Sequence, residues 1–110
     1  MYKQSLPALA REQLKTAHAA SSGRSASTLY GGHDQALRQT MIALAAGSRL
    51  DEHHNPGEAT LFVFSGRVRL LSQDVSWEGA AGDLLIIPQA VHSLEALEDS
   101  AVVLTVARRR

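Results

Sequence analysis

Apolar residues recur every three or four positions near the N-terminus, and this spacing predicts a helix over residues 6–20. Ser5 suits the cap position, and Pro7 suits the first turn. Such an amphipathic helix is expected to pack on its own domain or on a partner subunit. The apolar stripe consists of Leu6, Leu9, Ala10, Leu14 and Ala17.

Beyond residue 25 the pattern changes to alternating positions and short apolar runs, separated by Gly, Pro and Asp turns. Seven or eight short strands of this kind predict an all-β sandwich or barrel. We therefore expect a helix and linker over residues 1–24 and a β-barrel domain over residues 25–110. The strand candidates cover residues 28–30, 37–45, 59–65, 67–70, 84–87, 92–97 and 101–107, with a further pair around the turn at 73–74.

Composition narrows the classes of function. The 110 residues include no cysteine, which excludes disulfides and thiolate zinc sites and leaves nitrogen and oxygen as metal ligands. No apolar run reaches the roughly 20 residues of a membrane helix, so we expect a cytoplasmic protein. The net charge is zero, without the basic excess typical of nucleic-acid binding. Residues 51–99 nevertheless carry nine acidic and two basic residues, a net of −7, which favours a cation as ligand.

The densest polar cluster, residues 51–58, lies between two apolar strand candidates and contains two histidines and three carboxylates. Imidazoles and carboxylates together are typical of sites for iron, manganese, nickel or zinc. Adjacent side chains on a strand point to opposite faces, so His53 and His54 share a metal only if the strand contains a bulge.

Two sequence blocks in the β region resemble the two motifs of the cupin superfamily, which are small β-barrels of jelly-roll topology. The first block contains Gly47, His53 and Gly66, and the second contains Gly82, Pro88 and His92. The resemblance covers about residues 36–107. It implies a cupin-like jelly-roll barrel after one N-terminal helix, with His53 and His92 as the retained metal ligands.

The other two ligand positions of the cupin motifs differ in this chain. Asn55 occupies the second histidine position, and Glu58 lies one residue before the glutamate position. In one arrangement His53, Asn55 and the apolar residues after them face the barrel, which leaves two imidazoles and an amide. In the other, a bulge at residues 55–57 turns His54 and Glu58 inward, and with His92 they form a two-histidine, one-carboxylate site suited to iron or manganese.

Three functions remain open on this basis. The first is a barrel that binds a small molecule or a divalent metal (Fe, Mn, Ni or Zn) in its cavity. The second is a metal-dependent enzyme of oxygenase or isomerase type, in which Glu58 or a histidine moves a proton. The third is a stress-response sensor module with the same fold.

Two further residue pairs bear on partners. If Ala59 and its strand neighbours face the interior, Phe62 and Phe64 face outward and predict a homodimer. Arg67 and Arg69 alternate with apolar residues, which favours a solvated strand face over an inward anion-binding site.

Overall fold

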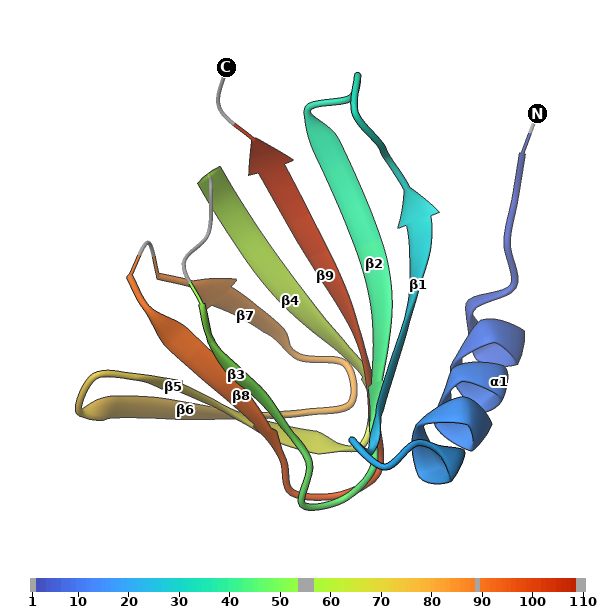
Figure 1. Ribbon diagram of the computed structural model, residues 1–110. Coiled ribbons are helices and arrows are strands. Elements are labelled where there is room, and N and C mark those ends of the chain that lie inside the picture. Colours follow the sequence, from blue (N-terminus) through green and yellow to red (C-terminus); the bar gives the residue numbers. More distant parts are fainter. Residues whose placement is uncertain (1, 54–56, 89, 109–110) are drawn as a thin grey trace.

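The computed structural model describes residues 2–53, 57–88 and 90–108, without the side chains of Glu52 and His53. One helix precedes nine strands in this part of the chain (Figure 1). The all-β prediction with an N-terminal helix is therefore confirmed. The elements are α1 (Leu6–Ala19), β1 (Arg24–Tyr30), β2 (Leu37–Leu44), β3 (Arg49–His53), β4 (Gly57–Ser65), β5 (Arg67–Ser72), β6 (Val75–Ala80), β7 (Leu84–Ile87), β8 (His92–Ala96) and β9 (Ser100–Arg108).

Strands β2 to β9 pair from the middle of the chain outward. β5 pairs with β6, β4 with β7, β3 with β8 and β2 with β9, all antiparallel, so the chain forms one long hairpin. Further pairing of β4 with β9 and of β5 with β8 rolls this hairpin into two sheets, ordered β1-β2-β9-β4-β7 and β3-β8-β5-β6. The result is a jelly-roll, and Figure 1 shows the two sheets facing each other.

Two strand segments differ from the sequence prediction. The polar cluster was expected to lie between strands, but Arg49–His53 forms β3, which pairs with β8. β1 begins at Arg24, four residues before the predicted strand. Both are edge strands of their sheets, where polar side chains are tolerated and the apolar alternation used for prediction is weak.

Two apolar cores hold the fold together. The larger lies between the sheets and includes Ala59, Leu61 and Val63 of β4, as the first sequence arrangement predicts. The smaller lies outside the five-stranded sheet, where α1 covers Met41 and Val103. Among the described residues, no helix is long and apolar enough to cross a membrane.

The outer face of the four-stranded sheet carries a row of ion pairs, so the solvated face predicted for Arg67 and Arg69 is observed. Arg69 contacts Glu95 and Glu78, each at 3.4 Å, from directly opposite strand positions. Arg49 contacts Glu95 at 3.6 Å, and Arg67 contacts Glu78 at 3.4 Å. Because these ion pairs are partly exposed, each adds little to the free energy of unfolding. Their main effect is to keep this face of the sheet toward solvent.

The turn glycines are not equivalent, and this yields a prediction. Gly66 has φ +87°, and a Cβ there would overlap the Asp99 carbonyl oxygen and lie 2.7 Å from the Ser100 Cα. Gly82 has φ +94° with open space around it. Gly66→Ala should lower the free energy of unfolding by about 3 kcal/mol or more, and Gly82→Ala by only about 1–2 kcal/mol. Urea denaturation measures both, and equal losses would contradict the structure.

Asp99 joins the helix to the barrel. Its Oδ1 accepts a hydrogen bond from the Ala46 backbone nitrogen, and its Oδ2 contacts His18 Nε2, each at 2.8 Å. The Ala46 hydrogen bond, followed by the His18 contact, lowers the pKa of the Asp99 carboxyl below its ordinary value of 3.8. Because folding lowers this pKa, the ionised carboxylate stabilises the fold above pH 3.8, and the contribution is lost as pH falls through the folded-state pKa.

We therefore predict that Asp99→Asn lowers the free energy of unfolding at pH 7 by up to about 1 kcal/mol, since the carboxylate is half exposed. The difference from wild type should shrink as pH falls below 3.8. Urea titrations at neutral and acidic pH test this, with the exposed turn residue Asp74, changed to Asn, as the control. A difference that is independent of pH would show that the Asp99 charge has no such role.

Candidate functional site

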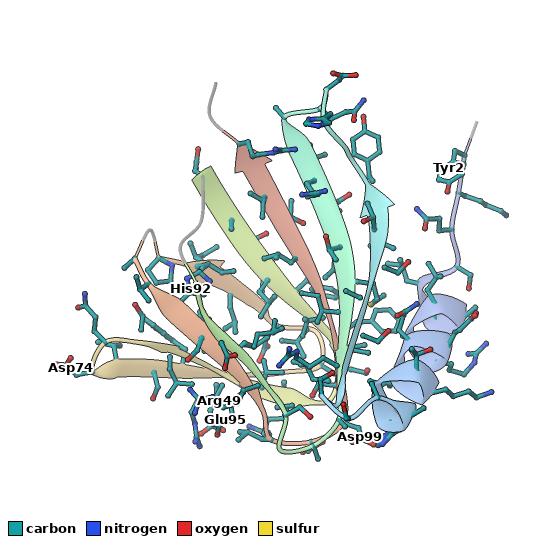
Figure 2. The ribbon with its side chains drawn as sticks, viewed as in Figure 1. Tyr2, Arg49, Asp74, His92, Glu95 and Asp99 are labelled. Atoms are coloured by element: carbon teal, nitrogen blue, oxygen red, sulfur yellow. The ribbon has the colours of Figure 1, made fainter. Side chains whose placement is uncertain are left out.

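His92 begins β8 and points into the barrel (Figure 2). Its side chain lies in the interior, with 2% of the residue exposed. The Nδ1 atom lies 3.0 Å from the Ala90 carbonyl oxygen, and only an N–H can pair with that acceptor, so Nδ1 carries the proton. Nε2 is then the basic nitrogen of the ring, which is the atom that accepts a hydrogen bond or binds a metal.

A bulge in β3 sets what lies opposite His92. Arg49 and Leu50 pair with Glu95 and Leu94, but the next described pair is His53 with His92, so β3 contains one extra residue between Leu50 and His53. The extra residue shifts the alternation of faces by one position. The backbone of His53 therefore lies opposite His92. The second sequence arrangement put the bulge at residues 55–57, whose first two residues are outside the described part, as is His54.

Glu58 lies away from His92. Along β4 the buried residues are Gly57, Ala59, Leu61 and Val63, so Glu58 belongs to the exposed face of the strand. There it borders a shallow outer depression formed with β7 and β9. The structure does not bring Glu58 to the interior as the second arrangement required, because strand alternation continues unbroken from Gly57 through Val63.

The interior beside His92 is almost full. Its cavity has a volume of about 20 Å³, which suffices for one water molecule or a single ion. No group of three histidine, aspartate or glutamate side chains suited to a metal occurs among the described residues. Within the described part of the chain, seven aliphatic residues line this cavity with His92: Ile42, Leu50, Leu61, Leu70, Ile87, Leu94 and Leu104.

The acidic excess of residues 51–99 is used mostly outside the barrel. Asp99 accepts a hydrogen bond from the Ala46 backbone nitrogen near the helix. Asp83 Oδ2 accepts one from the Ala80 nitrogen in the turn before β7. Glu58 lies on the outer face of β4. Three further carboxylates, those of Glu78, Glu95 and Glu98, contact arginines of the ion-pair row. These six acidic residues therefore lie away from His92.

Arg108 was not singled out in the sequence because it begins a run of three arginines at the C-terminus. In the structure it ends β9 on the same side as the buried Val106. Its Nη2 donates to the Gly32 carbonyl at 2.9 Å, and its Nε is buried without a hydrogen-bond partner in the described part of the protein. Arg108 lies on the barrel side of β9 because of the strand register, and no sequence motif marks it.

Comparison with solved structures places this geometry in a known fold. No protein-family model and no curated protein matches the sequence. A conserved Streptococcus pyogenes protein of unknown function superposes with TM-score 0.72 and 24% identity, covering 83% of this chain and 79% of the other. A cupin superfamily protein from Desulfitobacterium hafniense superposes with a TM-score of 0.72 and 14% sequence identity, and the match covers 78% of each chain. A Cupin 2 conserved barrel domain protein from Salinispora arenicola superposes with a TM-score of 0.70 and 18% sequence identity. This match covers 96% of this chain and 87% of the other. The chain therefore has the jelly-roll barrel fold of cupin proteins.

Proposed function

We propose that this protein is a cupin-type binding barrel whose site is built on His92 and whose occupant is a divalent metal ion. The observation that carries the proposal is the burial of one imidazole among aliphatic side chains, with its Nδ1 held by the Ala90 carbonyl. A histidine that binds metal usually donates its other ring N–H to such a carbonyl. The backbone of His53 lies directly opposite His92, and we propose His53, which the cupin resemblance implies as a ligand, as the second donor.

The size of the cavity supports an ion over an organic molecule in the barrel. Sites for organic ligands usually enclose about 300 Å³ or more. The interior beside His92 has about 20 Å³. A small molecule in this position would require the sheets to separate and expose Leu61, Leu70 and their neighbours, at the cost of apolar burial.

The donor set supports binding rather than catalysis. The described residues fit an ion held by imidazole, and they do not supply the carboxylate of a two-histidine, one-carboxylate site. Glu58, the carboxylate on which the oxygenase or isomerase alternative depends, lies on the other face of β4. An ion bound by His92 and His53 would supply a Lewis acid with open positions for water or a ligand. A sensor that reports metal availability needs no more than this.

We predict that protein purified without chelator contains a divalent metal, and that His92→Ala removes it. Adding the preferred ion among Fe(II), Mn(II), Ni(II) and Zn(II) to metal-free wild type should raise Tm by about 5 °C or more, because the ion binds only the folded state. Elemental analysis and thermal-shift measurements provide the two readouts.

Two matched variants make this test specific. His33 is an exposed loop histidine, and His33→Ala should keep the metal. Glu58→Ala should also keep it, because Glu58 faces away from the interior. Circular dichroism of His92→Ala establishes that the fold survives. Equal loading and equal stabilisation of wild type and His92→Ala would refute the site, whereas loss of metal in Glu58→Ala would reinstate the carboxylate-containing centre.

We also propose a homodimer formed through a patch on the outer face of the β7 edge, defined as Phe62, Leu84 and Ile86. Leu84 lies directly opposite Phe62, and Ile86 lies on the same face two residues later. Leu84 and Ile86 are 58% and 68% exposed, which is unusual for adjacent large apolar residues on an edge strand. Phe64 is instead packed in the core beneath α1, so it does not contribute.

Ile86→Glu should convert the dimer to a monomer, since it would place two charges in an interface where each copy meets the same patch. Light scattering at micromolar concentration measures the mass. Val75→Glu, at another exposed apolar position, should remain dimeric. A monomeric wild type under these conditions would rule out the dimer.

A further inference from the structure

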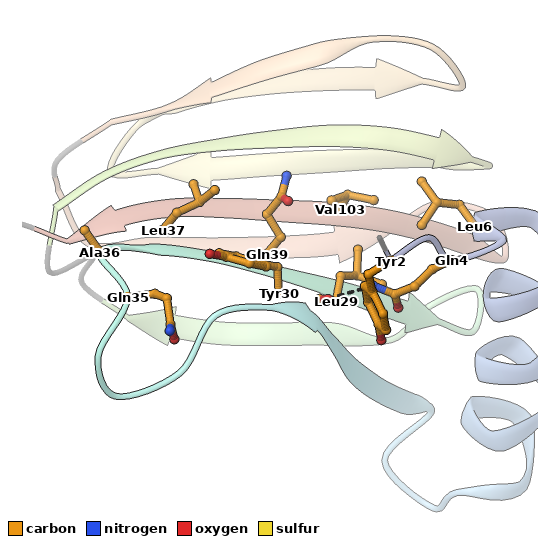
Figure 3. A pocket seen from close by; sticks show the side chains of 10 residues that line it. All are labelled: Tyr2, Gln4, Leu6, Leu29, Tyr30, Gln35, Ala36, Leu37, Gln39 and Val103. Carbon is orange, nitrogen blue, oxygen red and sulfur yellow. Dashed lines mark hydrogen bonds between the residues drawn. The ribbon is translucent and has the colours of Figure 1, made fainter.

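An open groove of about 640 Å³ lies outside the barrel, beside the N-terminal arm at residues 2–6 (Figure 3). This volume lies within the usual range for small-molecule sites, roughly 300–1,000 Å³. We call it the outer groove. It is separate from the β7 patch and from His92, and none of its ten lining residues carries a charge. The lining consists of two tyrosines, three glutamines and five aliphatic residues.

A bulge in β1 aims Tyr30 at this groove. Thr28 pairs with Thr40, but the next described pair is Tyr30 with Gln39, so β1 contains one extra residue at Leu29. Without the extra residue, strand alternation would turn Tyr30 to the same face as Thr28. With it, Leu29 and Tyr30 both line the outer groove, and the Tyr30 ring remains exposed. Bulges of this kind commonly re-aim a side chain at a functional site.

Hydrogen bonds fix two of the glutamines that border the groove. Gln4 Nε2 donates to the Leu29 carbonyl oxygen at 2.7 Å, which ties the N-terminal arm to the β1 bulge (dashed in Figure 3). Gln39 Nε2 donates to Thr105 Oγ1 at 3.2 Å across the sheet. Both contacts use the amide nitrogen, and the amide oxygen of each side chain is an acceptor. The groove therefore has oriented amide groups beside an apolar floor.

These features select the chemistry of a ligand. A charged ligand would lose hydration without meeting an opposite charge in the lining, which is unfavourable. A purely apolar ligand would cover the amide and phenol groups without pairing them. A ring with one apolar face and several hydroxyl groups satisfies both conditions: the face stacks on tyrosine and the hydroxyls pair with amides. We propose that the outer groove binds a neutral saccharide unit, independently of the barrel site.

The test is an NMR titration of the ¹⁵N-labelled full chain with methyl glucoside, maltose, cellobiose and N,N′-diacetylchitobiose, and with glucuronate as the charged counterpart. At least one neutral sugar should shift the amide signals of groove residues and saturate with a dissociation constant of about 1 mM, because an open site gives modest affinity. Tyr30→Ala should weaken this binding by about five- to tenfold. Glucuronate should bind more weakly than the neutral sugars.

Exposed positions keep the variants informative about binding rather than folding. Tyr2 and Tyr30 are both exposed, so their replacement by Ala should leave the spectrum of the remaining chain intact. Trp77 is an exposed aromatic residue on β6 outside the groove, and Trp77→Ala should bind as wild type does. The proposal is overturned if no sugar of the set shifts the signals of groove residues, or if Trp77→Ala and Tyr30→Ala weaken binding equally. It is also overturned if the signals of groove residues change when the protein is diluted, because a second copy of the chain would then be the occupant.

Discussion

Side chains along a β-strand alternate between its two faces, and this constraint along β4 determines which residues share the barrel interior. Ala59, Leu61 and Val63 are buried between the sheets, where they contribute to the main core. A shift of one residue would move all three to solvent and would bring Glu58 and Phe62 inside. The apolar core therefore holds Glu58 outside, while His92 lies among aliphatic neighbours in the interior.

Bulges supply the exceptions to alternation, and both proposed sites depend on one. In β3 an extra residue places His53, rather than Glu52, opposite His92. In β1 an extra residue places Tyr30 beside Leu29 on the outer face. Both strands lie at sheet edges, where an added residue disturbs only one ladder of hydrogen bonds. A further register shift lies in the central strand β4, between Val63 and Ser65.

Apolar periodicity and turn residues, which are local, were sufficient to predict the helix, most strands and a β-sandwich or barrel. The jelly-roll topology came from the resemblance of two sequence blocks to the cupin motifs. The sequence left two phases open for β4, and the structure selects the one in which Ala59, Leu61 and Val63 face inward. The missing information concerned the existence of β3 and the bulges in β1 and β3. A bulge is defined by register against a partner distant in the chain, so no local pattern near Leu29 or Leu50 reveals it. The inward side of Arg108 and the outer groove depend on the same tertiary pairing.

The central claim is that His92 is a buried imidazole, oriented by the Ala90 carbonyl, with Nε2 as its basic nitrogen. Long-range ¹H–¹⁵N correlation spectra of the histidine rings of metal-free protein at neutral pH test this most directly, with His92→Gln used to assign the His92 signals. The structure predicts that Nδ1 carries a proton, because only an N–H can pair with the Ala90 carbonyl oxygen. A His92 ring protonated at Nε2 alone, or averaging between the two tautomers as a solvated ring does, would contradict it.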